Sequence, residues 1–294
     1  MSCQAVDDVA MDMTLPTERL FLLEERLTFD DIRQRAADRR TQAFAGGLGG
    51  LLARPKTEEI ALVASQRRLE PFWHVAGGSR YVYDRTRGYN VPAAGNEVQS
   101  VTVNGEDYQI AAQGPARVFS LPVLEHCVEE FRSEVFVDAR SGAPVADGAS
   151  VVTGPKSEVP DPSELAVNET IVVPPEQRAS YVLRTVIGEL MRPIHADQLI
   201  EETLTLELAD LYYRPVYAFE YNWQPKNKTA VVEIDGATGQ IRQAPSLLHD
   251  VKGVFSQKDA WFDITADTVG MIVPGANIAM KLGRVAIQHQ KTSR

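Results

Sequence analysis

Hydrophobic and polar positions alternate with a period of two in two distant stretches of the chain. The first, "EVFVDARSGAPVAD", covers residues 134–147, and the second, "AVVEIDGATGQIRQ", covers residues 230–243. In each, β-forming residues run into an aspartate and then a glycine, the residue types that a tight turn between strands requires. Each stretch therefore predicts a β-hairpin, and the similarity of the two suggests that part of the chain is repeated.

The segments upstream of the two hairpins also correspond. Arg54-Pro55 matches Arg192-Pro193, and "EPFWHV", which begins at Glu70, matches "RPVYAF", which begins at Arg214. Several matches that occur in the same order favour a duplication over chance.

The spacing between equivalent residues changes along the chain. Pro71 and Pro215 are 144 positions apart, whereas Asp138 and Asp235 are 97 apart, so the first copy carries an insertion of 144 minus 97, or 47, residues. The insertion has its own hairpin signal at Asn104-Gly105, the strongest short cue for a two-residue turn.

A helix-like segment precedes the strands of each copy, at residues 28–44 and 174–191. The sequence therefore predicts an α+β fold of two related helix-plus-antiparallel-sheet units, the first with a β-hairpin insertion, followed by a C-terminal amphipathic helix. The expected divisions are a flexible N-terminal tail at 1–26, a first unit at 27–147 with its insertion at 85–124, an extended linker at 148–176, a second unit at 177–247 and a C-terminal amphipathic segment at 248–294.

The second copy resembles PepSY-type and related cystatin-like modules, whose signature is an aromatic strand followed by a strand that ends in Asp-x-x-Thr-Gly. The resemblance is strongest over residues 211–243 and weaker at the end of the first copy. It rests on Tyr217, Phe219, Tyr221, Val231, Val232, Asp235, Thr238, Gly239 and Ile241. The resemblance implies a small interaction or inhibitory module rather than an enzyme.

Composition narrows the classes of partner. The formal net charge is −10, so nucleic-acid binding, which needs a basic face, is disfavoured. The chain has two cysteines, too few for a disulfide framework, and the polar, acidic N-terminus does not resemble a signal peptide. We expect a cytoplasmic, bacterial-type protein.

Candidate chemistry is sparse. His126-Cys127 is a tempting pair, but adjacent residues of a strand point to opposite faces, so the histidine is not positioned to activate the thiol. The glycine-rich segment at 44–55 lacks the Lys-Ser/Thr that follows the glycines of a phosphate-binding loop. We therefore predict no catalytic residues, no metal and no cofactor, although an enzyme of undetected type remains an alternative.

A basic helix over residues 32–42 places four arginines on two turns: Arg33, Arg35, Arg39 and Arg40. We favour pairing with the many acids of this chain; an acidic protein surface or anionic lipid headgroups are the alternatives.

Aromatic residues gather on the repeated strands, and alternation places one set toward a core and the other toward a partner or groove. The candidate partner-binding residues are Trp73, Tyr83, Tyr213, Tyr217, Trp223 and Trp261. The predicted function is a non-catalytic protein-binding or assembly module, with a protein partner or a homo-oligomer. The alternative is a peripheral assembly factor that reaches a membrane surface through an apolar helix at 279–287.

Overall fold

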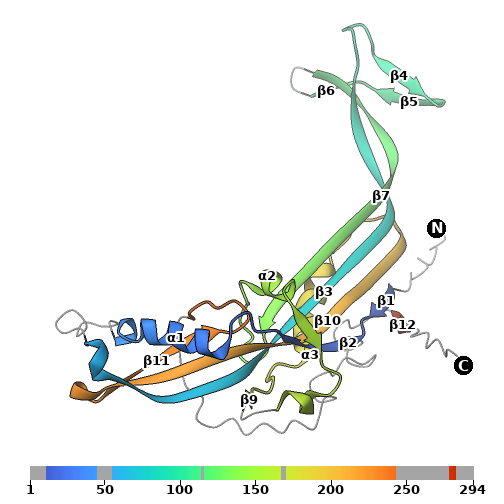
Figure 1. Ribbon diagram of the computed structural model, residues 1–294. Coiled ribbons are helices and arrows are strands. Elements are labelled where there is room, and N and C mark those ends of the chain that lie inside the picture. The colour runs from blue at the N-terminus through green and yellow to red at the C-terminus, as the bar shows by residue number, and fades with distance from the viewer. Residues whose placement is uncertain (1–10, 45–54, 114–115, 167–169, 243–277, 283–294) are drawn as a thin grey trace, which may run out of the picture.

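The computed structural model describes residues 11–44, 55–113, 116–166, 170–242 and 278–282. Most of these residues belong to one mixed ten-stranded sheet. Its two longest strands, which pair with each other, are β3 (Ile60–Pro92) and β10 (Gln198–Trp223). Three α-helices lie in the described part of the chain: α1 (Phe29–Arg39), α2 (Gly148–Val152) and α3 (Ala179–Leu190). A third long strand, β7 (Ala116–Asp138), runs beside β3, and the remaining strands and 3-10 segments are shorter (Figure 1).

The prediction of two separate α+β units is wrong. β3 and β10 pair antiparallel from Ile60–Trp223 to Asp84–Gln198, so the two halves of the chain share one sheet. Each of the two longer helices also packs on strands from the other half of the chain. α1, in the first half, packs on β10 and on β11 (Lys228–Asp235), whereas α3, in the second half, packs on β3 and β7 (Ala116–Asp138). The alternation of hydrophobic and polar residues correctly predicts strands in these segments, but a local pattern does not reveal which strands pair with each other.

The outer edge of β10 is covered by three short strands in succession. β1 (Met11–Leu15) and β2 (Glu18–Leu23) pair with it in parallel, and β11 pairs with its C-terminal part in an antiparallel hairpin. Residues 11–23, expected in a flexible tail, thus belong to the sheet. β12 (Ile278–Leu282) pairs in parallel with β1, so this part of the expected C-terminal amphipathic helix is a strand; the rest of that segment lies outside the described residues.

One face of the sheet is covered by the two longer helices. Thr28 caps the N-terminus of α1, and its hydroxyl accepts a hydrogen bond from the Asp31 amide (3.2 Å). The helix buries Ile32 and Ala36 against Tyr217, Phe219 and Tyr221. α3 is apolar along one side and buries Leu183, Ile187 and Leu190 against the largest core cluster, which contains Trp73 and Tyr213. Burial of these apolar stripes holds both helices on the sheet.

The opposite face is more polar near its centre. Arg68 contacts both Glu70 (2.6 Å) and Glu233 (2.5 Å), and Arg214 forms ion pairs with Asp235 and Asp147. A smaller apolar cluster beside these charges includes Phe21, Phe72, Tyr212 and two valines of α2. This face of the sheet therefore combines stacked aromatic rings with buried ion pairs.

The two Asp-to-Gly turns use the same hydrogen bonds. The Asp138 carbonyl accepts from the Gly142 amide (2.9 Å), and the Asp235 carbonyl accepts from the Gly239 amide (2.7 Å). Phe72 pairs with Asp138 and Val216 with Asp235, and Val216 lies 144 positions after Phe72. The expected equivalence of Asp138 with Asp235 is confirmed at the level of these contacts, although the units around them are not separate.

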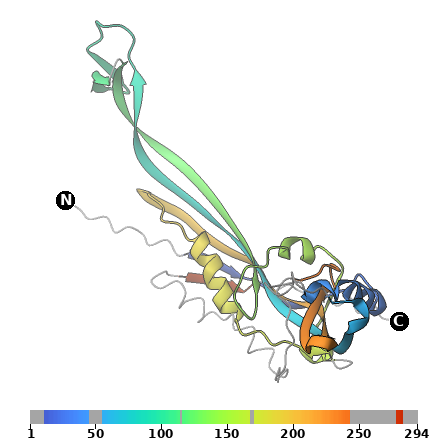
Figure 2. The ribbon, with the colours of Figure 1, turned by 90° about the vertical axis from the view of Figure 1, so that its left-hand side faces the viewer.

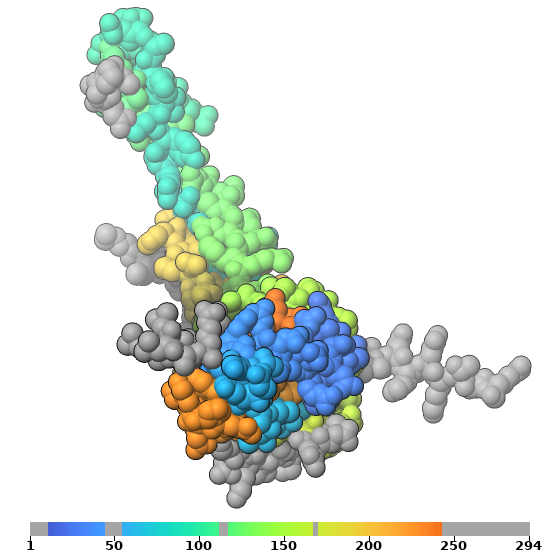
Figure 3. All heavy atoms as spheres, turned by 60° about the vertical axis from the view of Figure 1, so that its left-hand side comes forward, coloured from blue at the N-terminus to red at the C-terminus, as the bar shows by residue number. Residues whose placement is uncertain are grey.

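Residues from the expected insertion form a long projecting arm. Beyond Asp84, the last β3 residue that pairs with β10, β3 continues to Pro92 and pairs only with β7. A small two-stranded sheet of β4 (Ser100–Val103) and β5 (Glu106–Gln109) stands at the tip, and Asn104 and Gly105 adopt positive φ in its turn as the sequence predicts. Figures 2 and 3 show the arm standing well clear of the body.

The expected linker at 148–176 contains more structure than predicted, including α2. The remaining short elements are β6 (Ala111–Gln113), β8 (Lys156–Glu158), β9 (Ile171–Val172) and the 3-10 segments η1 (Gln42–Phe44), η2 (Thr57–Glu59), η3 (Pro162–Leu165) and η4 (Gln224–Lys226). β8 pairs with β2 and β9 pairs with β3, so this segment is hydrogen-bonded to the sheet at two places.

Candidate functional site: a groove between α1 and β11

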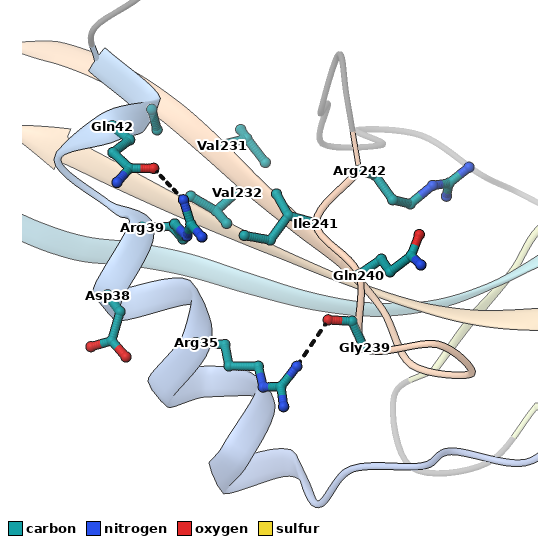
Figure 4. Close-up of a pocket in the computed structure, with 11 residues that line it drawn as sticks. Arg35, Asp38, Arg39, Gln42, Val231, Val232, Gly239, Gln240, Ile241 and Arg242 are labelled. Atoms are coloured by element: carbon teal, nitrogen blue, oxygen red, sulfur yellow. Dashed lines mark hydrogen bonds between the residues drawn. The ribbon is translucent and has the colours of Figure 1, made fainter.

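A groove lies between α1 and the outer edge of β11 (Figure 4). Its volume is about 990 Å³, and residues 239–242, which follow the Asp235 turn, form its far end. α1 supplies the polar wall, and Val231, Val232 and Ile241 supply apolar surface. We call it the α1–β11 groove.

The edge of β11 explains the shape of the groove. The Asp235 amide donates to the Gln240 carbonyl (2.9 Å), and the Arg242 amide donates to the Glu233 carbonyl (2.9 Å). Residues two apart on a strand direct their backbone groups to the same edge, so the peptide groups of Val231 and Thr229 also lie on the outer edge of β11. Within the described residues, no strand pairs with this part of the edge.

The groove is cationic on an acidic protein. Its charged lining residues are Arg35, Asp38, Arg39 and Arg242. Because Arg242 is paired with Glu70, the other three leave the groove a charge of +1, two arginines minus one aspartate, whereas the whole chain carries −10. Arg35 donates to the Gly239 carbonyl (3.2 Å) and Arg39 donates to the Gln42 side-chain oxygen (2.6 Å). Both of these hydrogen bonds go to neutral oxygens, so neither compensates the positive charge.

Arg242 has a different environment from the two helix arginines. It forms an ion pair with Glu70 on the polar face of the sheet. Burial opposes its charge, but the nearby carboxylates of Glu70, Glu233 and Asp235 together raise the pKa of the guanidinium. The Arg242 side chain extends away from Arg35 and Arg39 (Figure 4), so its charge serves the polar face of the sheet rather than the groove.

The sequence hypothesis for the basic helix is correct for only part of it. Arg33 pairs with Asp30 at 3.3 Å, as expected for arginines that neutralise acids of this chain. Arg35 and Arg39 instead point into the α1–β11 groove (Figure 4). Arg242 and the edge of β11 were not identified as site residues, because their position depends on how the chain returns along β11 after the turn.

The aromatic residues proposed as partner contacts are packed inside the protein. Trp73, Tyr83, Tyr213, Tyr217 and Trp223 are all at most 6% exposed. The Trp73 indole donates to the Gln177 carbonyl (2.7 Å), and the Trp223 indole donates to Glu59 (3.0 Å). These side chains offer no surface to a partner in this conformation. Trp261 lies outside the described residues.

His126 and Cys127 lie on the arm side of β7. The His126 ring nitrogen Nδ1 is 2.7 Å from the Asp84 carboxylate, and Cys127 is paired across the strands with Tyr83. The two side chains of this pair point to opposite faces of the ribbon, as expected for neighbours on a strand. Among the described residues, no group of three or more potential metal ligands comes together.

Comparisons with protein-family models, with curated proteins and with solved structures found no match to this chain. The resemblance to PepSY-type and cystatin-like modules therefore stays a prediction. None of the helices that the structure describes is both long enough and apolar enough to cross a membrane.

Proposed function

We propose that the protein is a non-catalytic binding module that takes an extended, acidic protein segment into the α1–β11 groove. The observation that carries this proposal is that Arg35 and Arg39 line the same groove as Val231, whose peptide groups lie on the edge of β11 that faces away from β10. A strand added to this edge gains main-chain hydrogen bonds from β11, and its side chains meet the guanidinium groups. A cytoplasmic location rests on cysteine usage and stays a prediction.

Each part of the groove has a role in this mode of binding. The peptide groups of Val231 and Thr229 supply affinity that does not depend on the partner's sequence. The two arginines select acidic side chains, and each gives up only a hydrogen bond to a neutral oxygen in order to pair with a carboxylate. The apolar surface of Val232 and Ile241 accommodates the side chains that alternate with the acids.

Binding of a fluorescent peptide tests the proposal. The probe is a peptide of about ten residues in which Glu alternates with Val, and fluorescence anisotropy reports its dissociation constant. Arg35→Glu and Arg39→Glu are each expected to weaken binding about tenfold or more, and added salt should weaken it further. The matched control is Arg33→Glu, on the same helix but paired with Asp30.

Main-chain pairing has its own test. Methylation of the backbone nitrogens on one alternate set of the peptide should abolish binding, whereas methylation of the other set should leave it nearly unchanged, because only one edge of the added strand faces β11. Equal weakening by Arg33→Glu, or equal binding of a peptide with Gln in place of Glu, would contradict the proposal.

A further inference from the structure

The tip of the arm carries exposed carboxylates on a strand edge, the features that the α1–β11 groove is proposed to bind. Glu106 and Asp107 are exposed on β5, and Glu97 is exposed in the segment that leads into β4. β5 pairs with β4 on one side only within the two-stranded sheet. Glu106 and Asp107 point to opposite faces of β5, and the Asp107 carboxylate accepts a hydrogen bond from the Thr102 hydroxyl (2.5 Å). The tip therefore presents a strand edge that carries a carboxylate on each face, opposite in charge to the arginines of the groove.

The tip and the groove lie at opposite ends of the molecule. In both ribbon views the sheet of β4 and β5 stands at one extremity, and α1 with β11 stands at the other (Figures 1 and 2). The arm alone, from Arg85 to Pro92, extends about 26 Å at 3.3 Å per residue. A tip cannot reach the groove of its own molecule but is free to reach that of a neighbour.

The arm and its tip are weakly supported by their own molecule. A two-stranded sheet is marginally stable in water unless something packs on it. The tip sheet is fastened to the arm by the ring contact of Tyr108 with Phe119 (6.0 Å) and by Arg117, which donates to the Val98 carbonyl (2.6 Å). If the free edge of β5 paired with a strand of another sheet, the two-stranded tip sheet would become part of a larger sheet.

We propose that the occupant of the groove is the β5 edge of a second copy of this chain, so that copies associate head to tail. This inference rests on the proposed function and names its partner. The contact joins two different surfaces, tip and groove, and such a heterologous contact propagates into open chains or closes into a ring. The protein would then be an assembly unit.

Sedimentation velocity of the full chain over a concentration series tests the inference. The wild type should form species larger than a dimer as concentration rises, and less so at high salt. A groove variant, Arg35→Gln with Arg39→Gln, and a tip variant, Glu106→Gln with Asp107→Asn, should each remain monomeric. A control that removes two exposed carboxylates elsewhere, Glu158→Gln with Glu164→Gln, should associate like the wild type.

Mixing the two monomeric variants gives the sharpest result. The groove variant keeps a native tip and the tip variant keeps a native groove, so one native contact is available and the mixture should stop at a two-chain species. A wild type that stays monomeric up to about 1 mM, or a dimer unaffected by the tip variant, would overturn the inference. The peptide measurement then decides independently whether the groove binds acidic strands at all.

Discussion

Glu70 and Arg214 face each other across β3 and β10, and they are equivalent positions of the repeat, 144 residues apart. One step away on either side, Pro71 pairs with Tyr213 and Leu69 pairs with Pro215. The two long strands are thus related by a local two-fold axis through this pair. Each of the two charges is compensated by a residue that follows one of the Asp-to-Gly turns: Glu70 by Arg242, and Arg214 by Asp147.

Removal of the Arg214 charge should destabilise the protein strongly. Arg214 is 8% exposed and pairs with Asp235, which is 3% exposed, so Arg214→Met leaves a buried carboxylate without its partner. We expect a loss of about 3–5 kcal/mol in the free energy of unfolding, measured by chemical denaturation. Adding Asp235→Asn should recover part of it, since Asn removes the charge and still accepts from the Thr238 amide. Equal losses in the single and double variants would argue against this account.

Acid should weaken the same region through Asp147. Its hydrogen bonds with Arg214 lower the pKa of the Asp147 carboxyl. A carboxyl with a lowered folded-state pKa contributes stability above its unfolded pKa of about 3.9, and this contribution is lost as the pH falls through the lower, folded value. The stability difference between wild type and Asp147→Asn should therefore be constant near neutral pH and shrink below about pH 4. A difference that persists in acid would show that Asp147 acts by packing instead.

The two repeated turns should respond unequally to alanine. Gly142 and Gly239 have φ of 76° and 74°, so a side chain at either position costs about 1–2 kcal/mol. A Cβ at Gly239 would also lie 2.8 Å from Leu27 Cδ1, whereas the nearest atom to one at Gly142 is 3.9 Å away. Gly239→Ala should therefore lower the melting temperature more than Gly142→Ala.

A helical glycine provides the opposite control for these substitutions. Gly188 lies within α3, and a Cβ built there meets no atom within 4 Å. Gly188→Ala should raise the free energy of unfolding by about 0.5–1 kcal/mol, because alanine loses less conformational entropy in a helix. A destabilising effect would mean that α3 packs more closely at this point than the structure shows.

Local features of this fold could be predicted from the sequence, and long-range features could not. The Asp235 turn, the Asn104-Gly105 hairpin and both longer helices are specified by neighbouring residues, and each was located correctly. The pairing of β3 with β10 joins residues far apart in the chain, and nothing in either strand alone identifies its partner. The segments that the sequence predicts as two separate units therefore form one sheet.

Errors about strands and exposed faces have the same origin. "IAMKL" at 278–282 suits a short helix or a strand, and its pairing with β1 decides in favour of the strand. Trp73 and Tyr213 were proposed as partner contacts because alternation exposes one face of an isolated sheet, but α3 covers that face. Arg35 and Arg39 were noticed in the sequence, while the groove they line exists only because β11 lies beside α1.

The arm should be dispensable for folding, although the proposed head-to-tail assembly requires it. Arg85 and Glu125 pair across the ribbon, so an Asn-Gly turn that replaces residues 86–124 can close the shortened hairpin. Beyond this pair, β3 and β7 form their strand hydrogen bonds with each other. Removal of residues 86–124 also removes an exposed hydrogen bond to the body, from the Thr86 amide to Asp197. We expect the melting temperature to change by no more than about 2–4 °C, equivalent to about 1 kcal/mol, while self-association in sedimentation velocity disappears. Loss of cooperative unfolding would show instead that the arm supports the body, and retained self-association would move the contact away from the tip.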